Sequence, residues 1–216
     1  MIPDIKARSP QEGDLLQGRD PVKLAKALAA AGAQVFSVVT EKEHFGGSLQ
    51  ILQEIVQAVS QPVLRKDFIN SPQQLRETAD TGARAVLLIA SMLAKEQLYE
   101  LIEYAHILGL EPLVETHNEE EIRSLNELDL SILGINNRNI VELETDDGSV
   151  KTTEELAGLA KSGTLLISES GIASPQDVKR AAQAGAHAVL VGTAILQARD
   201  PAQMYQNLNI MRGKDL

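Results

Sequence analysis

The chain repeats one short unit, in which an Ala-rich helix end is followed by a glycine and then by a run of apolar residues. Three copies read AAAGAQVFSVV at 29–39, ADTGARAVLLI at 79–89 and AQAGAHAVLV at 182–191. Each glycine suits the left-handed position that ends a helix. The apolar runs hardly alternate with polar residues, which is typical of parallel strands covered on both faces. The unit therefore predicts helices that alternate with buried strands.

Continued along the chain, this pattern gives eight strands and eight helices. The strands are predicted near 2–6, 34–39, 62–66, 85–89, 112–115, 132–135, 165–168 and 188–191. The helices are predicted near 21–31, 49–60, 71–81, 95–108, 118–126, 153–161, 175–184 and 201–209. Four of them begin with Ser or Asp before a proline, a common helix start, at Asp20-Pro21, Ser71-Pro72, Ser174-Pro175 and Asp200-Pro201.

Strict alternation of strands and helices implies a parallel sheet with right-handed crossovers. Eight such repeats in 216 residues predict a compact α/β protein, a single-domain (β/α)8 TIM barrel that occupies residues 1–216. A doubly wound open sheet is the alternative, but no G-x-G-x-x-G motif follows the first predicted strand.

Charge and cysteine content restrict the partners. The formal net charge is −10, which argues against a nucleic-acid surface. The chain has no cysteine, so it has neither disulfides nor cysteine-bound metals, which fits a cytoplasmic protein. We find no apolar signal core at the N-terminus and no run long enough to span a membrane, and expect no membrane partner.

Polar residues gather where the predicted strands end, and barrel enzymes carry their active sites at the carboxyl ends of the strands. Lys66, in the stretch VLRKDF, ends the third strand. Burying this lysine is costly unless a carboxylate or an anionic ligand pairs with it. The simpler alternative is a solvated pair between Lys66 and Asp67.

The other strand ends add more polar groups to the same rim. These are Asp4 and Lys6, which share a strand face, Glu115, Asn136-Asn137-Arg138, Glu169-Ser170-Gly171 and Gly192-Thr193. The glycine turns after the seventh and eighth strands, at Gly171 and Gly192, predict a phosphate site, although both could serve only to permit tight turns.

The histidines carry less information. His106 and His187 are predicted to be structural, and His44 and His117 lie near the rim without ligand spacing to another His or Cys. We expect neither a metal nor a cofactor.

Taken together, these residues resemble the indole-3-glycerol-phosphate synthase family of tryptophan biosynthesis. The matching motifs are DIKARSP (4–10), FGGSL (45–49), PVLRKDFI (62–69), AVLLIA (85–90), LVETH (113–117), LGINNRN (133–139), SESGI (168–172) and AVLVGTAIL (188–196). The resemblance implies a decarboxylating lyase that converts 1-(2-carboxyphenylamino)-1-deoxyribulose 5-phosphate to indole-3-glycerol phosphate, with loss of carbon dioxide and water.

The resemblance also implies roles for the rim residues. Lys66 would be the general acid, Glu115 the general base and Lys6 a second lysine that contacts substrate. Asn136, Glu169 and Ser170 would orient the substrate and the lysines. Ser9, Gly171, Gly192 and Thr193 would hold the phosphate. Phe68 and Leu87 would form walls of an aromatic pocket, and Arg138 a rim contact. Apart from the resemblance, the strand face that Asp4 shares with Lys6 predicts that Asp4 holds this ammonium in position.

The chain departs from the family pattern in three places. The family usually has glutamate at the position of Asp4. The segment 140–153 is longer and more acidic than in the family. Family members carry helices before the first strand, and here that strand begins almost at Met1, so we expect a barrel that lacks most of this N-terminal helical extension.

Two alternatives to the synthase remain open at this point. One is a paralogous barrel enzyme that acts on a different phosphorylated substrate, supported by Asp4 and by the segment after the sixth strand. The other is a non-catalytic binding barrel, against which the combination of Lys6, Lys66, Glu115 and Asn136 argues, because a buried charge cluster is costly to keep. The oligomeric state is not predicted.

Overall fold

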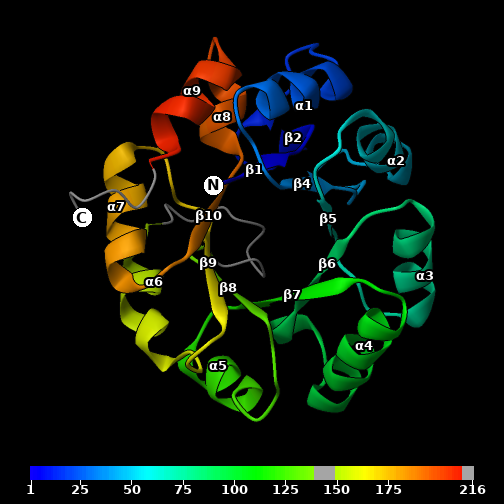
Figure 1. The fold of residues 1–216 in the computed structure, drawn as a ribbon, viewed down its shortest axis with the longest axis vertical. Helices are drawn as coiled ribbons and strands as arrows, with labels where there is room; N and C mark the ends of the chain where they lie inside the picture. Colours follow the sequence, from blue (N-terminus) through cyan, green and yellow to red (C-terminus); the bar gives the residue numbers. More distant parts are fainter. Residues whose placement is uncertain (139–148, 211–216) are drawn as a thin grey trace.

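The computed structural model, which describes residues 1–138 and 149–210, is a closed barrel of parallel strands surrounded by helices (Figure 1). The barrel strands, in spatial order, are β1 (Ile2–Ile5), β10 (Ala188–Val191), β9 (Leu165–Glu169), β8 (Ile132–Asn136), β7 (Glu111–Thr116), β6 (Ala85–Ile89), β5 (Val63–Lys66) and β4 (Phe36–Val39). Pairing between β4 and β1 closes the barrel. The predicted TIM-barrel fold is confirmed.

Helices follow the strands along the chain and form the outer ring (Figure 1). They are α1 (Pro21–Ala30), α2 (Leu49–Ala58), α3 (Pro72–Asp80), α4 (Lys95–Ile107), α5 (Glu119–Leu125), α6 (Lys151–Leu156), α7 (Pro175–Ala184), α8 (Thr193–Gln197) and α9 (Pro201–Leu208). Asp20, Ser174 and Asp200 accept backbone N–H groups as N-caps, whereas Ser71 makes no such side-chain bond.

The structure differs from the sequence prediction in three places. An antiparallel hairpin of β2 (Arg8–Ser9) and β3 (Gly13–Asp14) follows β1, and α8 is an extra helix directly after β10. The predicted helix over 153–161 is instead α6 followed by a 3-10 turn at Ala157–Leu159. These pieces are two to six residues long, too short to show a hydrophobic period.

Strand residues alternate between the barrel interior and the helix-facing side. Inside, the strands contribute one apolar cluster, made of Ile2, Leu64, Leu87, Ile89, Leu113, Ile167 and Leu190. Two larger apolar clusters lie between the sheet and the helices. Because successive strand residues face opposite sides, Leu64 and Lys66 share the interior side of β5, while Arg65 faces the helices.

The glycines of the repeated unit take the backbone conformation that the sequence predicts. Gly32, Gly82 and Gly185 have φ values of 106°, 85° and 116°. A side chain is strained in this region, so glycine ends the helix and turns the chain toward the next strand at little cost. Among the described residues, no helix is long and apolar enough to cross a membrane.

Candidate active site at the barrel mouth

The predicted site residues come together at the carboxyl ends of the strands. Asp4, Lys6, Lys66, Glu115, Asn136 and Glu169 are all buried there, although each is charged or polar. Asp4, Lys66, Glu115 and Glu169 each lie two residues beyond a member of the apolar interior cluster, on the same side of the strand. The barrel interior is therefore apolar along the middle of the strands and highly polar at their carboxyl ends.

Lys66 pairs with two buried carboxylates. Its Nζ lies 3.5 Å from Oε2 of Glu115 and 4.0 Å from Oε2 of Glu169. Neither glutamate side chain is exposed to solvent. Asp67, the partner in the simpler alternative, pairs instead with Arg65 at 2.9 Å. Arg65 also donates to Thr40, Gln74 and Thr78, so this second pair fastens α3 and the end of β4 to β5.

The two carboxyl groups hold their protons very differently. Burial alone would raise the pKa of Glu115, but Lys66, His117 and Asn136 outweigh it and lower this pKa to about 2. Burial, with the charges of Glu115 and Asp4, raises the pKa of Glu169 well above its usual range despite Lys66. Glu115 therefore releases its proton far more readily than Glu169, which favours an ionised Glu115 and a protonated Glu169 beside Lys66.

Glycine at position 134 makes room for Glu169. A Cβ atom built on Gly134 of β8 would overlap Oε1 of Glu169, which comes from the neighbouring strand β9. The motif LGINN therefore needs glycine for a packing reason, because a side chain there would displace a buried carboxyl group.

Two cavities open at the mouth, and Asp4, Lys6 and Lys66 line both. The first, of about 250 Å³, has both polar and apolar surface and is lined by glycine turns and by the charged Glu12 and Arg138; we call it the polar cavity. Its walls include Arg138, Ser170, Gly171, Gly192 and Thr193, which the sequence analysis places at the rim. Gly171 and the preceding Ser170 both have positive φ, at 68° and 61°.

The second cavity is much smaller, at about 20 Å³, and its surface is mainly apolar. Its walls include Phe45, Phe68, Leu87 and Ile89, two of which, Phe68 and Leu87, are the predicted walls of an aromatic pocket. Phe45 meets Phe68 edge to face with ring centroids 6.5 Å apart, and Lys6 lies over the Phe45 ring at 5.7 Å. An extended molecule with an anionic end and an aromatic end would place its middle beside the two lysines.

Ser9, expected to hold the phosphate, and Asp4, expected to hold Lys6, make hydrogen bonds with other residues. Ser9 is buried, and its hydroxyl accepts the backbone N–H of Glu12 at 3.0 Å; Glu12 lines the polar cavity and accepts a hydrogen bond from Gln197 of α8. Asp4 accepts a 2.6 Å hydrogen bond from Ser37 on β4 and packs against Gly192. Most of the segment 140–153 lies outside the described residues.

Sequence reasoning missed His117, which has no ligand spacing but touches Glu115. Its Nε2 lies 3.3 Å from Oε1 of Glu115. The signal was present in the motif LVETH, because residues two apart on a strand share a face.

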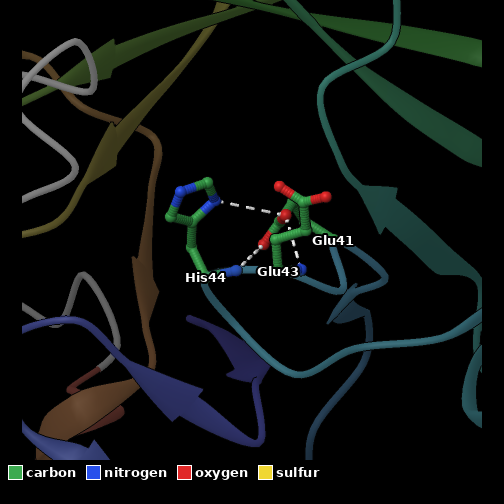
Figure 2. Close-up of side chains that lie close together, drawn as sticks. All are labelled: Glu41, Glu43 and His44. Atoms are coloured by element: carbon green, nitrogen blue, oxygen red, sulfur yellow. Dashed lines mark hydrogen bonds and ion pairs between the residues drawn. The ribbon is translucent and has the colours of Figure 1, made fainter.

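Glu41, Glu43 and His44 form a group whose potential metal ligands lie within 4.8 Å of one another (Figure 2). The Glu41 carboxylate accepts the backbone N–H groups of Glu43, His44 and Phe45 and faces the His44 ring. These bonds occupy its oxygens and explain the group as the cap of a tight loop. The absence of a metal stays a prediction.

A closed parallel barrel with a buried lysine–carboxylate cluster between a polar and an apolar cavity defines the class of (β/α)8-barrel enzymes. The model of the family "Indole-3-glycerol phosphate synthase" matches residues 1–208. The chain belongs to the indole-3-glycerol phosphate synthase family.

Relatives agree over nearly the full length. Indole-3-glycerol phosphate synthases of Thermococcus kodakarensis and Pyrococcus furiosus are each 44% identical, over 96% and 94% of this chain and 91% and 89% of their own lengths. That of Shouchella clausii is 44% identical over 94% of this chain and 79% of its own length. The crystal structure of orotidine 5'-phosphate decarboxylase from Pyrococcus horikoshii OT3 superposes with a TM-score of 0.68, covering 98% of this chain and 100% of that one; at 16% identity this likeness concerns the fold alone.

Proposed function

We propose that the chain catalyses ring closure of 1-(2-carboxyphenylamino)-1-deoxyribulose 5-phosphate to indole-3-glycerol phosphate. The observation that carries the proposal is the pair of cavities joined at Lys6 and Lys66. The substrate has a phosphate at one end, an aromatic ring at the other and a ketone between them, so its polarity matches the two cavities in order. The apolar cavity, at about 20 Å³, must widen to admit the ring.

In this assignment the phosphate occupies the polar cavity. Gly171 and Gly192 leave backbone N–H groups unobstructed by side chains, Thr193 adds a hydroxyl and Arg138 a positive charge. The Ser9 hydroxyl accepts the backbone N–H of Glu12 and so positions the loop that forms one wall of this cavity. The carboxyphenyl ring occupies the apolar cavity between Phe68 and Leu87, where burial of aromatic surface stabilises the complex.

Lys66 is the proposed general acid. A bond forms between the ketone carbon and the ring carbon that carries the carboxylate, and the ketone oxygen takes a proton from the Lys66 ammonium. The bond to the carboxylate then breaks, carbon dioxide leaves, and its electron pair restores the aromatic ring. Lys6, over the Phe45 ring and lining both cavities, contacts the substrate as the second cation.

Glu115 is the proposed general base for the loss of water. It takes a proton from the methylene carbon beside the nitrogen, the hydroxyl group on the former ketone carbon leaves as water with a proton from the Lys6 ammonium, and the new carbon–carbon double bond completes the indole.

The low pKa of Glu115 keeps it ionised at neutral pH, as a base requires. Because its side chain is fully buried and paired with Lys66, the base step requires the ammonium to move toward the substrate. Asn136 and Glu169, whose raised pKa favours the protonated form, orient Glu115 and Lys66, and Ser170 orients the substrate.

The remaining proposals concern location and partners. We place the protein in the cytoplasm, because a chain without cysteine fits a reducing compartment, and a net charge of −10 disfavours nucleic acid.

The test is incubation of the purified chain with the carboxyphenylamino substrate. We expect growth of indole fluorescence together with release of one carbon dioxide per product. A chain that binds the substrate but yields neither would favour the non-catalytic barrel, and turnover of another phosphorylated substrate alone would favour the paralogue.

A further inference from the structure

His117 lies between two carboxylates at the end of β7. Its Nε2 is 3.3 Å from Oε1 of Glu115, and its Nδ1 is 3.5 Å from Oε2 of Glu121 on α5. The side chains of His117 and Glu121 are 15% and 16% exposed, and that of Glu115 is fully buried. The imidazole therefore links a buried carboxylate of the site to the helix outside the barrel.

Glu121 is a fixed anchor for this link. Its Oε2 accepts the backbone N–H of His117 at 2.8 Å, and its Oε1 accepts the side-chain amide of Asn118 at 2.6 Å. Asn118 in turn caps α5 by accepting the backbone N–H of Glu121. This reciprocal cap holds the Glu121 carboxylate at the start of the helix, facing the ring.

The arrangement favours the charged form of His117. A neutral imidazole has one N–H group, so one of its nitrogens would face a carboxylate with a lone pair. Only the imidazolium has an N–H group on each nitrogen and a positive charge to pair with both Glu115 and Glu121, which lie at ion-pair distance. Burial alone would lower the pKa of His117, but these two carboxylates outweigh it and raise the pKa to about 9.

The other groups that face Glu115 come from three strands. Lys66 of β5 lies at its Oε2, Asn136 of β8 lies beside it, and Glu169 of β9, whose pKa is raised, lies against both Glu115 and Lys66. Each oxygen of Glu115 thus has its own cation, with Lys66 at Oε2 and His117 at Oε1. In the proposed reaction Lys66 gives up its proton, so only the second cation stays throughout.

We propose that His117 is a positioning residue, whose imidazolium, anchored by Glu121, keeps the Glu115 carboxylate oriented and ionised while Lys66 changes its charge. The inference rests on the proposed function, because it assigns His117 a part in that reaction. It predicts that loss of His117 changes the pH dependence of turnover, which a purely structural role would not do.

The first test is the pH profile of kcat for His117→Gln, with the exposed His106→Gln as the matched control. Without the imidazolium, Glu115 takes up a proton more readily, so the acid limb of kcat should move up by at least about one pH unit. At neutral pH we expect kcat to fall about tenfold with KM within about twofold, because a positioned group is disturbed rather than substrate binding. His106→Gln should match the wild type.

The second test follows the ring itself by ¹⁵N NMR of labelled histidine, with the His117 signal assigned by its loss in His117→Gln. In the wild type it should titrate near pH 9. Glu121→Gln, which keeps the shape and the helix cap, should lower that midpoint and bring the alkaline loss of kcat to lower pH.

An unchanged kcat profile in His117→Gln, or a His117 titration that ignores Glu121→Gln, would overturn the inference. The NMR arm needs no turnover. An inactive wild type with the expected titration would therefore refute the proposed function but leave the ion pairs of His117 with Glu115 and Glu121 supported. An active wild type with a His117 that is neutral at pH 7 would refute the role of His117 alone.

Discussion

Nζ of Lys66 lies 3.5 Å from Oε2 of Glu115, and both side chains are buried at the carboxyl end of the barrel. A buried ion pair gives little net stability, but removal of one partner leaves the other uncompensated and is strongly destabilising. The pair is therefore poorly explained as a stabilising contact and well explained as an acid and a base held ready beside the substrate cavities.

Replacement of this lysine should affect both rate and stability. We expect Lys66→Met, which keeps an unbranched aliphatic side chain, to lower kcat by about 10²–10⁴-fold, because the proton donor is lost. We also expect a lower melting temperature at neutral pH, since Glu115 then lacks a counter-charge. Lys161→Met, at an exposed lysine, is the matched control and should leave kcat unchanged. Retention of most turnover in Lys66→Met would contradict the acid role.

The two buried glutamates should respond differently to the same substitution. Glutamine mimics a protonated carboxyl group, so Glu169→Gln should keep kcat within about tenfold of the wild type. Glu115→Gln removes the ionised base, so its kcat should fall by about 10²–10⁴-fold. Steady-state kinetics of both variants provide the check. Equal losses in the two would show that the protonation states are assigned wrongly.

Stability against pH tests the same assignment without turnover. The pKa of Glu169 is raised in the folded state, so above the usual pKa of 4.5 the unfolded chain releases a proton that the folded chain keeps. Glu169 therefore costs the wild type stability as the pH rises above 4.5. Urea unfolding at pH 4 and pH 7 should show Glu169→Gln gaining stability relative to the wild type between the two values. A difference independent of pH would speak against a raised pKa.

Asp4 tests whether the synthase reaction is matched to this chain. The Asp4 carboxylate accepts a hydrogen bond from Ser37. One more methylene group in the side chain would carry the carboxylate further into the barrel mouth, toward Lys6 and Lys66. A misplacement of ~1 Å can cost ~10²-fold, so we expect Asp4→Glu to raise turnover of the carboxyphenylamino substrate. If neither the wild type nor Asp4→Glu forms product, the paralogue becomes the better account.

The sequence predicts the barrel and most of the rim because both depend on local patterns. The positions of Gly32, Gly82 and Gly185 mark helix ends, and the apolar runs after them mark the strands. The period of two along a strand then places Lys66 inside, together with Leu64.

The sequence does not show which charged side chains pair with one another, because ion pairing depends on which strands are neighbours and on how far the side chains reach. Sequence proximity suggests a pair between Lys66 and Asp67, but Arg65 takes Asp67 on the outer side of β5, and Lys66 reaches Glu115 on β7 and Glu169 on β9. His117 was overlooked for the same reason, since its role depends on Glu121 of the following helix.

The central claim is that the two cavities beside Lys6 and Lys66 hold the two ends of one substrate. The most direct measurement is a crystal structure of the chain with indole-3-glycerol phosphate bound. We predict the phosphate between Gly171 and Gly192, the indole against Phe68 and Leu87, and Lys66 within hydrogen-bond reach of the glycerol chain. A ligand bound with its indole in the glycine-lined cavity, or outside the barrel mouth, would contradict the account.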